Sequence, residues 1–422
     1  MEHQVRIKPH LVVPILTVGV LVGFQLFAPA PALTYVIAVL VVAVGVGYYW
    51  ARQLASKVKL EREQRYGWAQ VGDVLEERFT LHNDSWLPVL WAEVHDRSTM
   101  PGYTASRVTG VDGQTYTRWQ VEGECRRRGV YTLGPVQIRM GDPFGFFTVE
   151  IEVGRESSFV VYPVIAALPP LEPPRGTTFG RVRSARRSIV ATPNVASVRP
   201  YVPGDTLCRI HWRTTARREE LYVKEYDNEL AGDLWIILDL HGAVQAGQGD
   251  VSTEEHAVTL AASLAAAMLR QNRAVGFLSE GAERTLLPLE SGETQLWRIL
   301  RSLAAARAVG DKPLGRLLQE AAPVLGRGLT AIVITPSIDP EWLAALADLQ
   351  QRAIATSVLL LDPASFGGPS GSAAMMGLLS DRGVAAQIIT QSFRFRPLVE
   401  HRRQRPTYKV LGTGRVIAVP PA

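Results

Sequence analysis

The chain has 422 residues, with 45 lysine and arginine residues against 40 aspartate and glutamate residues, and a formal net charge of +5. This length accommodates two or three domains with buried cores. The small positive excess does not by itself indicate a nucleic-acid-binding protein, although it suits a position near anionic lipid. Two cysteines, Cys125 and Cys208, exclude a disulfide framework and leave open a single disulfide, and their scarcity is typical of a reducing compartment.

Residues 1–56 contain two apolar segments, 11–28 and 33–50, without a charged residue. Each is close to the ~20 residues that a transmembrane helix needs, so we expect a transmembrane helical hairpin. Basic residues flank the pair: Arg6, Lys8, Arg52, Lys57, Lys59 and Arg62. The connecting loop has no charge. The positive-inside rule therefore predicts a two-pass protein of the inner or plasma membrane, with both termini and the soluble domains in the cytoplasm.

Residues 57–165 alternate short apolar runs with turn residues, which predicts an antiparallel β domain. The candidate strands are 74–82, 89–94, 129–133, 136–140 and 159–162. We interpret the triple arginine at 126–128 as a solvated strand end, with a lipid or partner contact as the alternative. Residues 166–198 are a basic linker containing prolines. Its arginines predict an electrostatic contact with the cytoplasmic leaflet or with an acidic partner, and a mobile loop is the alternative.

The most distinctive stretch, 199–226, reads RPYVPGDTLCRIHWRTTARREELYVKEY. Pro203 and Gly204 suit the second and third positions of a turn. The alternation that follows predicts a strand over 208–213, with Trp212 in the core. A second short strand is expected over 221–226, and it carries Lys224.

The cationic face of this stretch has two interpretations. Arginine forks bind carboxylates and phosphates, so Arg209, Arg213 and Arg217 can form a partner-docking face beside His211. Residues 199–229 contain six basic and six acidic residues, which favours internal ion pairs instead. Asp205 is expected to cap the turn or to pair with a nearby arginine.

This pattern resembles the signature of the bacterial "domain of unknown function 58" family. The residues that carry the resemblance are Arg199, Tyr201, Pro203, Gly204, Asp205, Arg209, His211, Trp212, Arg213, Arg217 and Lys224. The segments 126–131 (RRRGVY) and 141–147 (GDPFGFF) are similar to further family motifs. The resemblance implies a membrane-tethered protein with a β-rich domain and a von Willebrand factor A-like domain, often associated with MoxR-type AAA+ ATPases. It implies no known chemistry.

The family signature opens a region, 199–392, in which strands and helices alternate, as in a doubly wound von Willebrand A-like α/β domain. The expected strands are 234–240, 274–278, 329–335, 354–361 and 383–389. The expected helices are 252–272, which a capping box opens, 293–307, 314–325 and one that starts at Asp339 and Pro340. A basic tail, 393–422, is expected to be solvated.

Candidate chemistry is sparse. Asp239 ends the first of these strands, where von Willebrand A-like domains carry an Asp-x-Ser-x-Ser metal site, but this chain reads Asp-Leu-His-Gly-Ala. Asp239 is therefore a degenerate metal-site position, and we expect no metal and no other cofactor. A strand would place Cys208 and His211 on opposite faces, and no Walker A, nucleophile-elbow or His-Glu-x-x-His motif is present.

The sequence thus predicts a membrane-anchored, non-enzymatic adaptor or scaffold whose cytoplasmic domains bind another protein. A MoxR-type AAA+ ATPase is the partner that the family resemblance implies. The alternative is a metal-dependent hydrolase that uses Asp239 and His241. No nucleic-acid partner is expected, because acidic residues surround most of the basic ones.

Overall fold

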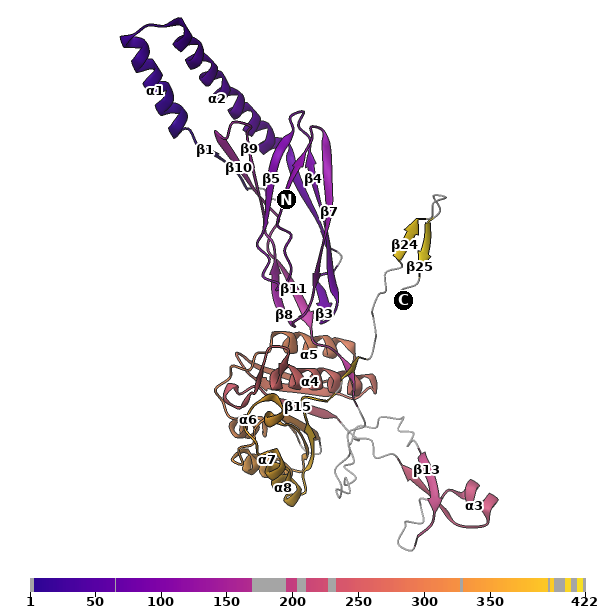
Figure 1. The fold of residues 1–422 in the computed structure, drawn as a ribbon. Helices are drawn as coiled ribbons and strands as arrows, with labels where there is room; N and C mark the ends of the chain where they lie inside the picture. The colour runs from indigo at the N-terminus through magenta and orange to yellow at the C-terminus, as the bar shows by residue number, and fades with distance from the viewer. Residues whose placement is uncertain are drawn as a thin grey trace. The chain divides into compact units, whose positions relative to one another are not determined.

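The computed structural model describes residues 4–64, 66–168, 195–202, 210–226, 233–326, 329–393, 395–397, 407–410 and 416–419 (Figure 1). The chain divides into two compact units. Unit 1 comprises Met1–Pro163 and Leu300–Ala306, and unit 2 comprises Val164–Ile299 and Arg307–Ala422.

Two apolar helices, α1 (Val12–Phe27) and α2 (Pro31–Lys57), lie side by side near the N-terminus of unit 1 (Figure 1). Pro31 stands in the first turn of α2, where its missing N–H costs no hydrogen bond. Within the described residues, α2 alone is long and apolar enough to cross a membrane, and α1 is a shorter apolar helix. The structure therefore contains one candidate membrane-spanning helix near the N-terminus.

The remainder of unit 1 is a β domain. Its described sheets have the strand orders β1-β10-β9-β5-β6, β2-β4-β7 and β3-β11-β8. The strands are β1 (Gln4–Pro9), β2 (Val58–Gln64), β3 (Trp68–Gln70), β4 (Val74–Asn83), β5 (Val89–Asp96), β6 (Arg107–Val111), β7 (Thr115–Glu124), β8 (Gly129–Leu133), β9 (Val136–Gly141), β10 (Phe147–Val153) and β11 (Ser157–Tyr162). The antiparallel character expected from the sequence is confirmed, with β3 and β11 as a parallel pair.

Alternating burial along these strands builds the core of unit 1. In β4 and β7, Phe79 and Trp119 stack with ring centroids 5.6 Å apart. Leu54 of α2 is fully buried in the same core, so the end of α2 belongs to the β domain. Cys125 is also buried there and forms no disulfide, and burial raises the pKa of its thiol to about 11.

A six-stranded sheet forms the centre of unit 2, with the strand order β19-β18-β15-β20-β21-β22. The strands are β15 (Leu234–Asp239), β18 (Val275–Glu280), β19 (Arg284–Glu290), β20 (Thr330–Thr335), β21 (Ala355–Leu361) and β22 (Ala385–Ile389). Neighbouring strands are parallel except at the edge, where β19 is antiparallel to β18. Every residue of β15 and β20 is buried, as expected of parallel strands covered on both faces.

Helices pack against this sheet: α4 (Thr253–Arg270), α6 (Leu314–Ala321), α7 (Trp342–Gln351) and α8 (Ser372–Asp381). Helix α5 (Glu293–Ala305) begins in unit 2, and its residues from Leu300 onward belong to unit 1. The expected capping box is confirmed, because the Ser252 hydroxyl accepts the N–H of Glu255 at the start of α4. Helix α4 contacts four of the parallel strands, while α6, α7 and α8 share a core with alternate residues of the sheet, among them Ile237 and Val333.

Several described elements were not expected from the sequence: β1, β2, β3, β6, β7, β10, β19 and α8. The shorter ones are β12 (Ala166–Ala167), β16 (Gly247–Gln248), β17 (Val251–Ser252), β23 (Arg396–Pro397), β24 (Thr407–Val410), β25 (Val416–Val419) and the 3-10 turns η2 (Gly242–Val244) and η3 (Pro363–Phe366). Strand β1 is short and polar at alternate positions, so its place in a sheet depends on β10, its antiparallel partner.

Candidate functional site

The distinctive stretch of the sequence folds as a small hairpin with an inserted helix. Strand β13 (Val195–Pro200) pairs antiparallel with β14 (Tyr222–Tyr226), and helix α3 (Trp212–Arg218) lies between them in sequence. The strand expected over 221–226 is confirmed as β14. In the register of the hairpin, Arg199 of β13 stands opposite Val223 and Lys224 of β14 opposite Val198. Residues 203–209, with Pro203, Gly204, Asp205, Cys208 and Arg209, lie outside the described residues.

The strand expected over 208–213 is wrong. The described part of it forms a single bridge, from Ile210 to Val223, and then turns into α3. A local cap explains the difference: Nδ1 of His211 accepts the backbone N–H of Thr214 at 3.2 Å, which satisfies one of the free donors of the first turn. Glu219 closes the helix with a left-handed φ of 58°.

Helix α3 has an inner face toward β14 and an outer face toward solvent. On the inner face, Thr215 Oγ1 accepts the N–H of Tyr222 at 3.1 Å, and the Arg218 guanidinium lies 5.5 Å from the Tyr222 ring centre. At 100° per residue, the opposite face is made by Trp212, Arg213, Ala216 and Arg217, all of them exposed. We name these four residues the outer α3 face.

Trp212 is 67% exposed, so the expected core position is wrong. The alternation that suggested burial applies to a strand, whereas in the helix Trp212 falls on the side away from β14. In the described part of the chain, no ion pair joins Arg213 or Arg217 to an acidic residue. Tyr201, at the other side of the hairpin, donates its N–H to the carbonyl of Leu221 at 2.8 Å.

The second candidate is the carboxyl edge of the sheet in unit 2. Asp239 and Thr335 end β15 and β20, the neighbours between which the strand order reverses. Thr335 Oγ1 donates to Asp239 Oδ2 at 2.6 Å, and the backbone N–H of His241 donates to Oδ1 at 3.0 Å. Burial raises the pKa of the Asp239 carboxyl, and the hydrogen bonds from Thr335 and His241 oppose this change.

This edge has the form of a structural clamp. Thr335 Oγ1 also accepts the N–H of Ser337 at 2.9 Å, so one buried network ties the two strand ends together. The described residues include no group of three or more His, Cys, Asp or Glu side chains that could hold a metal ion. Both oxygens of Asp239 are occupied by protein donors, and nothing at this edge supports hydrolysis by Asp239 and His241.

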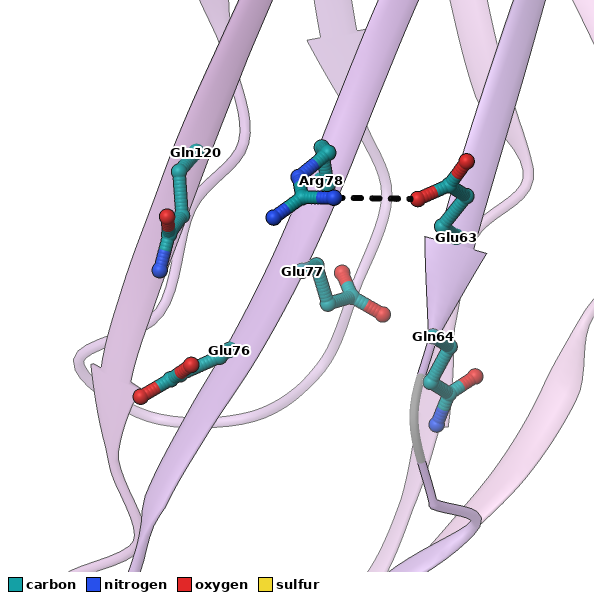
Figure 2. A pocket seen from close by; sticks show the side chains of 6 residues that line it. All are labelled: Glu63, Gln64, Glu76, Glu77, Arg78 and Gln120. Carbon is teal, nitrogen blue, oxygen red and sulfur yellow. Dashed lines mark ion pairs between the residues drawn. The ribbon is translucent and has the colours of Figure 1, made fainter.

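A third feature, a polar hollow of about 220 Å³, lies on the sheet β2-β4-β7 of unit 1. Its lining residues are Glu63, Gln64, Glu76, Glu77, Arg78 and Gln120 (Figure 2). Arg78 and Glu63 form an ion pair of 3.6 Å across it, drawn dashed in Figure 2.

The buried carboxylate beside this hollow is already paired. Glu77 receives two nitrogens of Arg62, at distances of 2.8 to 3.1 Å, and the hydroxyl of Tyr103. Burial, followed by the bond to Glu77, raises the pKa of Tyr103. Sequence reasoning missed this cluster because its three residues belong to different segments of the β domain. Their saturation by one another makes it a structural polar core.

The triple arginine at 126–128 is not a uniformly solvated strand end. Arg126 pairs with Glu124 at 2.9 Å on the surface. Arg128 is buried within unit 1, where its guanidinium donates to the backbone carbonyls of Leu303 at 3.0 Å and Ala306 at 2.8 Å. These carbonyls lie at the C-terminal end of a helix, where a cation is favoured.

Comparisons with known proteins identify relatives. Residues 197–406 match the family described as "Protein of unknown function DUF58". "Uncharacterized protein YeaD" of Bacillus subtilis (strain 168) is 26% identical over 193 residues, which cover 46% of each chain. "Uncharacterized protein Rv1480" of Mycobacterium tuberculosis (strain ATCC 25618 / H37Rv) is 25% identical over 173 residues, covering 39% of this chain and 54% of the relative. The chain thus spans about half the length of the curated relatives it matches.

Similar solved structures are more distant. A von Willebrand factor type A protein from Catenulispora acidiphila is 14% identical at a TM-score of 0.26, covering 37% of this chain and 38% of that protein. A FixG-related protein from Vibrio parahaemolyticus is 10% identical at a TM-score of 0.18, covering 25% of this chain and 96% of that protein. The sequence signature and the family match together show that residues 197–406 belong to the DUF58 family, whose function is unknown.

Proposed function

We propose that this protein is a two-pass membrane-anchored scaffold whose soluble units bind a partner protein. One observation carries the proposal: the helical pair leaves a folded domain and returns to it. Strand β1 pairs with β10 over six residues, Gln4 to Pro9, and α1 begins three residues later. Helix α2 then continues directly into β2 of the same unit. This connection of both helices to one folded unit supports a topology in which the two ends of the pair lie on the same side of the bilayer.

The surface of the pair supports insertion. No lysine, arginine, aspartate or glutamate occurs between Lys8 and Arg52. The apolar window of α2 is only 6% buried in the protein, so α2 is not the core helix of a soluble domain. Sixteen residues give α1 a length of about 24 Å, somewhat short of a ~30 Å hydrocarbon core, and a bilayer can thin locally to match it. The basic residues at both ends support a cytoplasmic position for the soluble units.

We also infer that unit 2 is a doubly wound, von Willebrand A-like domain. Its chain starts in the central strand β15, reaches β18 and the edge strand β19 on one side, and then crosses to β20, β21 and β22 on the other. Complete burial of β15 and β20 supports helices on both faces of the sheet. In this arrangement the clamp of Asp239 and Thr335 takes the place of a metal site.

The outer α3 face is the docking surface that we propose for the partner. Tryptophan and arginine dominate the energetic centres of protein interfaces. Trp212, Arg213 and Arg217 are exposed, while the inner face of α3 makes the contacts that hold the hairpin. The arginines suit an acidic partner surface with an apolar pocket for the indole. A MoxR-type AAA+ ATPase is the partner that the family resemblance suggests.

The membrane part of the proposal is tested by alkaline carbonate extraction of native membranes. We expect the full chain to stay in the membrane fraction. A protease added to sealed, right-side-out vesicles should leave the soluble units intact and should digest them once the vesicles are opened. Release of the chain by carbonate would refute the proposed membrane anchor. Digestion of the soluble units in sealed vesicles would show that they lie on the opposite side of the membrane.

The docking part is tested with the full chain in nanodiscs and the purified MoxR-type ATPase of the same organism. The double variant W212A/R213A should weaken binding at least tenfold, about 1.4 kcal/mol, and should unfold at the wild-type temperature. The control W297A/R301A removes the same residue types from α5 and should bind normally. If W212A/R213A and the control both bind as tightly as the wild type, the outer α3 face is not the docking surface. No binding by the wild type in any nucleotide state would remove the ATPase as partner.

A further inference from the structure

The turn between β9 and β10 is built by one carboxylate. Asp142 is buried, and its side chain accepts the backbone N–H of Phe144 at 2.9 Å and that of Phe147 at 2.6 Å. Gly145 takes a φ of +74°, which a glycine adopts without strain. The hydrogen bonds to Asp142 therefore fix the shape of the turn through the backbone of Phe144, while the Phe144 ring takes no part in them.

This turn lies where both apolar helices meet the β domain. On one side, β1 ends with Pro9 opposite Phe147, and the N–H of His10 donates to the carbonyl of Phe146 at 2.7 Å, just before α1 begins. On the other side, Gly47 of α2 lies against Asp142, since a Cβ at Gly47 would come within 2.9 Å of Oδ2. The turn, the start of α1 and the middle of α2 are thus at one level.

The residues exposed at this level are aromatic. The Phe144 ring is 49% exposed at the tip of the turn and stacks on Phe146 with centroids 5.7 Å apart. Tyr48 and Tyr49 of α2 are exposed as well, and Arg52 follows one turn later, on the side of the β domain. At a membrane surface, aromatic side chains commonly lie at the level of the lipid headgroups, with basic residues next to them on the cytoplasmic side.

We propose that the Gly141–Phe147 turn is a third membrane contact, in which the Phe144 ring inserts into the interfacial region of the phospholipid bilayer. The inference rests on the proposed anchoring by α1 and α2. The exposed Phe144 ring belongs to a turn that lies against α2 and against the start of α1, and the exposed residues of both helices are largely apolar, which argues for lipid and against a protein as the occupant. This contact then holds the β domain against the membrane surface at the base of the helical pair and restricts its rotation relative to the membrane.

The test uses the full chain in proteoliposomes of phosphatidylethanolamine and phosphatidylglycerol, with an NBD fluorophore on single cysteines. Cys208 is replaced by serine, while Cys125 is buried with a raised thiol pKa and stays unlabelled. Labels are placed by F144C, by V39C in the exposed part of α2, and by V130C on β8. In Figure 1, β8 lies at the end of the β domain away from α2. Quenching by lipids with a nitroxide near the headgroup or deep in the chain is then compared.

We expect the label at position 39 to be quenched by the deep nitroxide, the label at 144 by the shallow nitroxide, and the label at 130 by neither. A label at 144 that behaves like the one at 130 overturns the inference while the anchor stands. A blue-shifted but unquenched label at 144 also overturns it, because a protein surface then covers the turn. An unquenched label at 39 refutes the membrane anchor itself, and the inference falls with it.

Discussion

Replacing Thr335 by valine tests whether the buried clamp at the carboxyl edge of the sheet stabilises unit 2. The substitution keeps the side-chain shape and removes a hydroxyl that donates to Asp239 and accepts from Ser337. Loss of the buried hydrogen bond to the Asp239 carboxyl, together with the buried Ser337 N–H that is left without an acceptor, costs about 3 kcal/mol. For a unit of this size, that loss lowers the melting temperature by roughly 6–12 °C.

The assay is urea unfolding of the full chain in detergent, followed by tryptophan fluorescence, with Thr356→Val as the matched control. Thr356 lies on the neighbouring strand β21, is also buried, and its hydroxyl has no hydrogen-bond partner among the described residues. Removing that hydroxyl should leave the free energy of unfolding unchanged or slightly raised. If T335V is no less stable than T356V, the clamp contributes nothing and the reasoning is refuted.

The clamp also makes a pH-dependent prediction. Burial raises the pKa of Asp239 above its unfolded value of ~3.9, so the folded chain holds this proton more tightly than the unfolded chain. The contribution of Asp239 to stability is then fully present at low pH and is lost as the pH rises through the folded pKa. Because the Thr335 hydrogen bond favours the carboxylate, T335V should cost more at pH 7 than at about pH 4. An equal cost at both values would contradict the prediction that the Thr335 hydrogen bond favours the carboxylate form of Asp239.

Two further predictions concern the partly buried His256 and the buried Gly47. His256 packs edge-on against the Phe366 ring, 4.8 Å away, and burial lowers its pKa, so the unfolded chain takes up a proton first below about pH 6.5. The free energy of unfolding should fall from pH 7 to 5, and H256Q should flatten this slope; an unchanged slope in H256Q would assign it to other groups. In α2, G47A should cost about 1–3 kcal/mol, because its methyl group meets Asp142, whereas G45A should be neutral because nothing lies within 4 Å. Thermal unfolding in detergent compares the two, and equal melting temperatures would show that α2 does not pack tightly on the turn.

The sequence by itself determined the elements whose signal is local. The charge-free segments before residue 51 predict apolar helices, and the period-two runs of the β domain predict strands with one buried face. The fully apolar runs of unit 2 predict strands that are buried on both faces. The capping box at Ser252 is likewise readable, because the donor and acceptor lie three residues apart. From the sequence, Asp239 could be recognised as the end of a strand that lacks the serines of a metal site. Its hydrogen-bond partner, Thr335, could not be recognised in this way.

Tertiary structure decided the rest. Residues 208–213 alternate as a strand does, yet the His211 cap and the contacts of Tyr222 with Thr215 and Arg218 favour a helix, and the helix turns Trp212 outward. The pairing of β1 with β10 and the hydrogen bond from Thr335 to Asp239 join segments about a hundred residues or more apart. Periodicity describes how one segment divides its own faces, whereas these features depend on which distant donor, acceptor or strand edge is brought beside it when the chain folds.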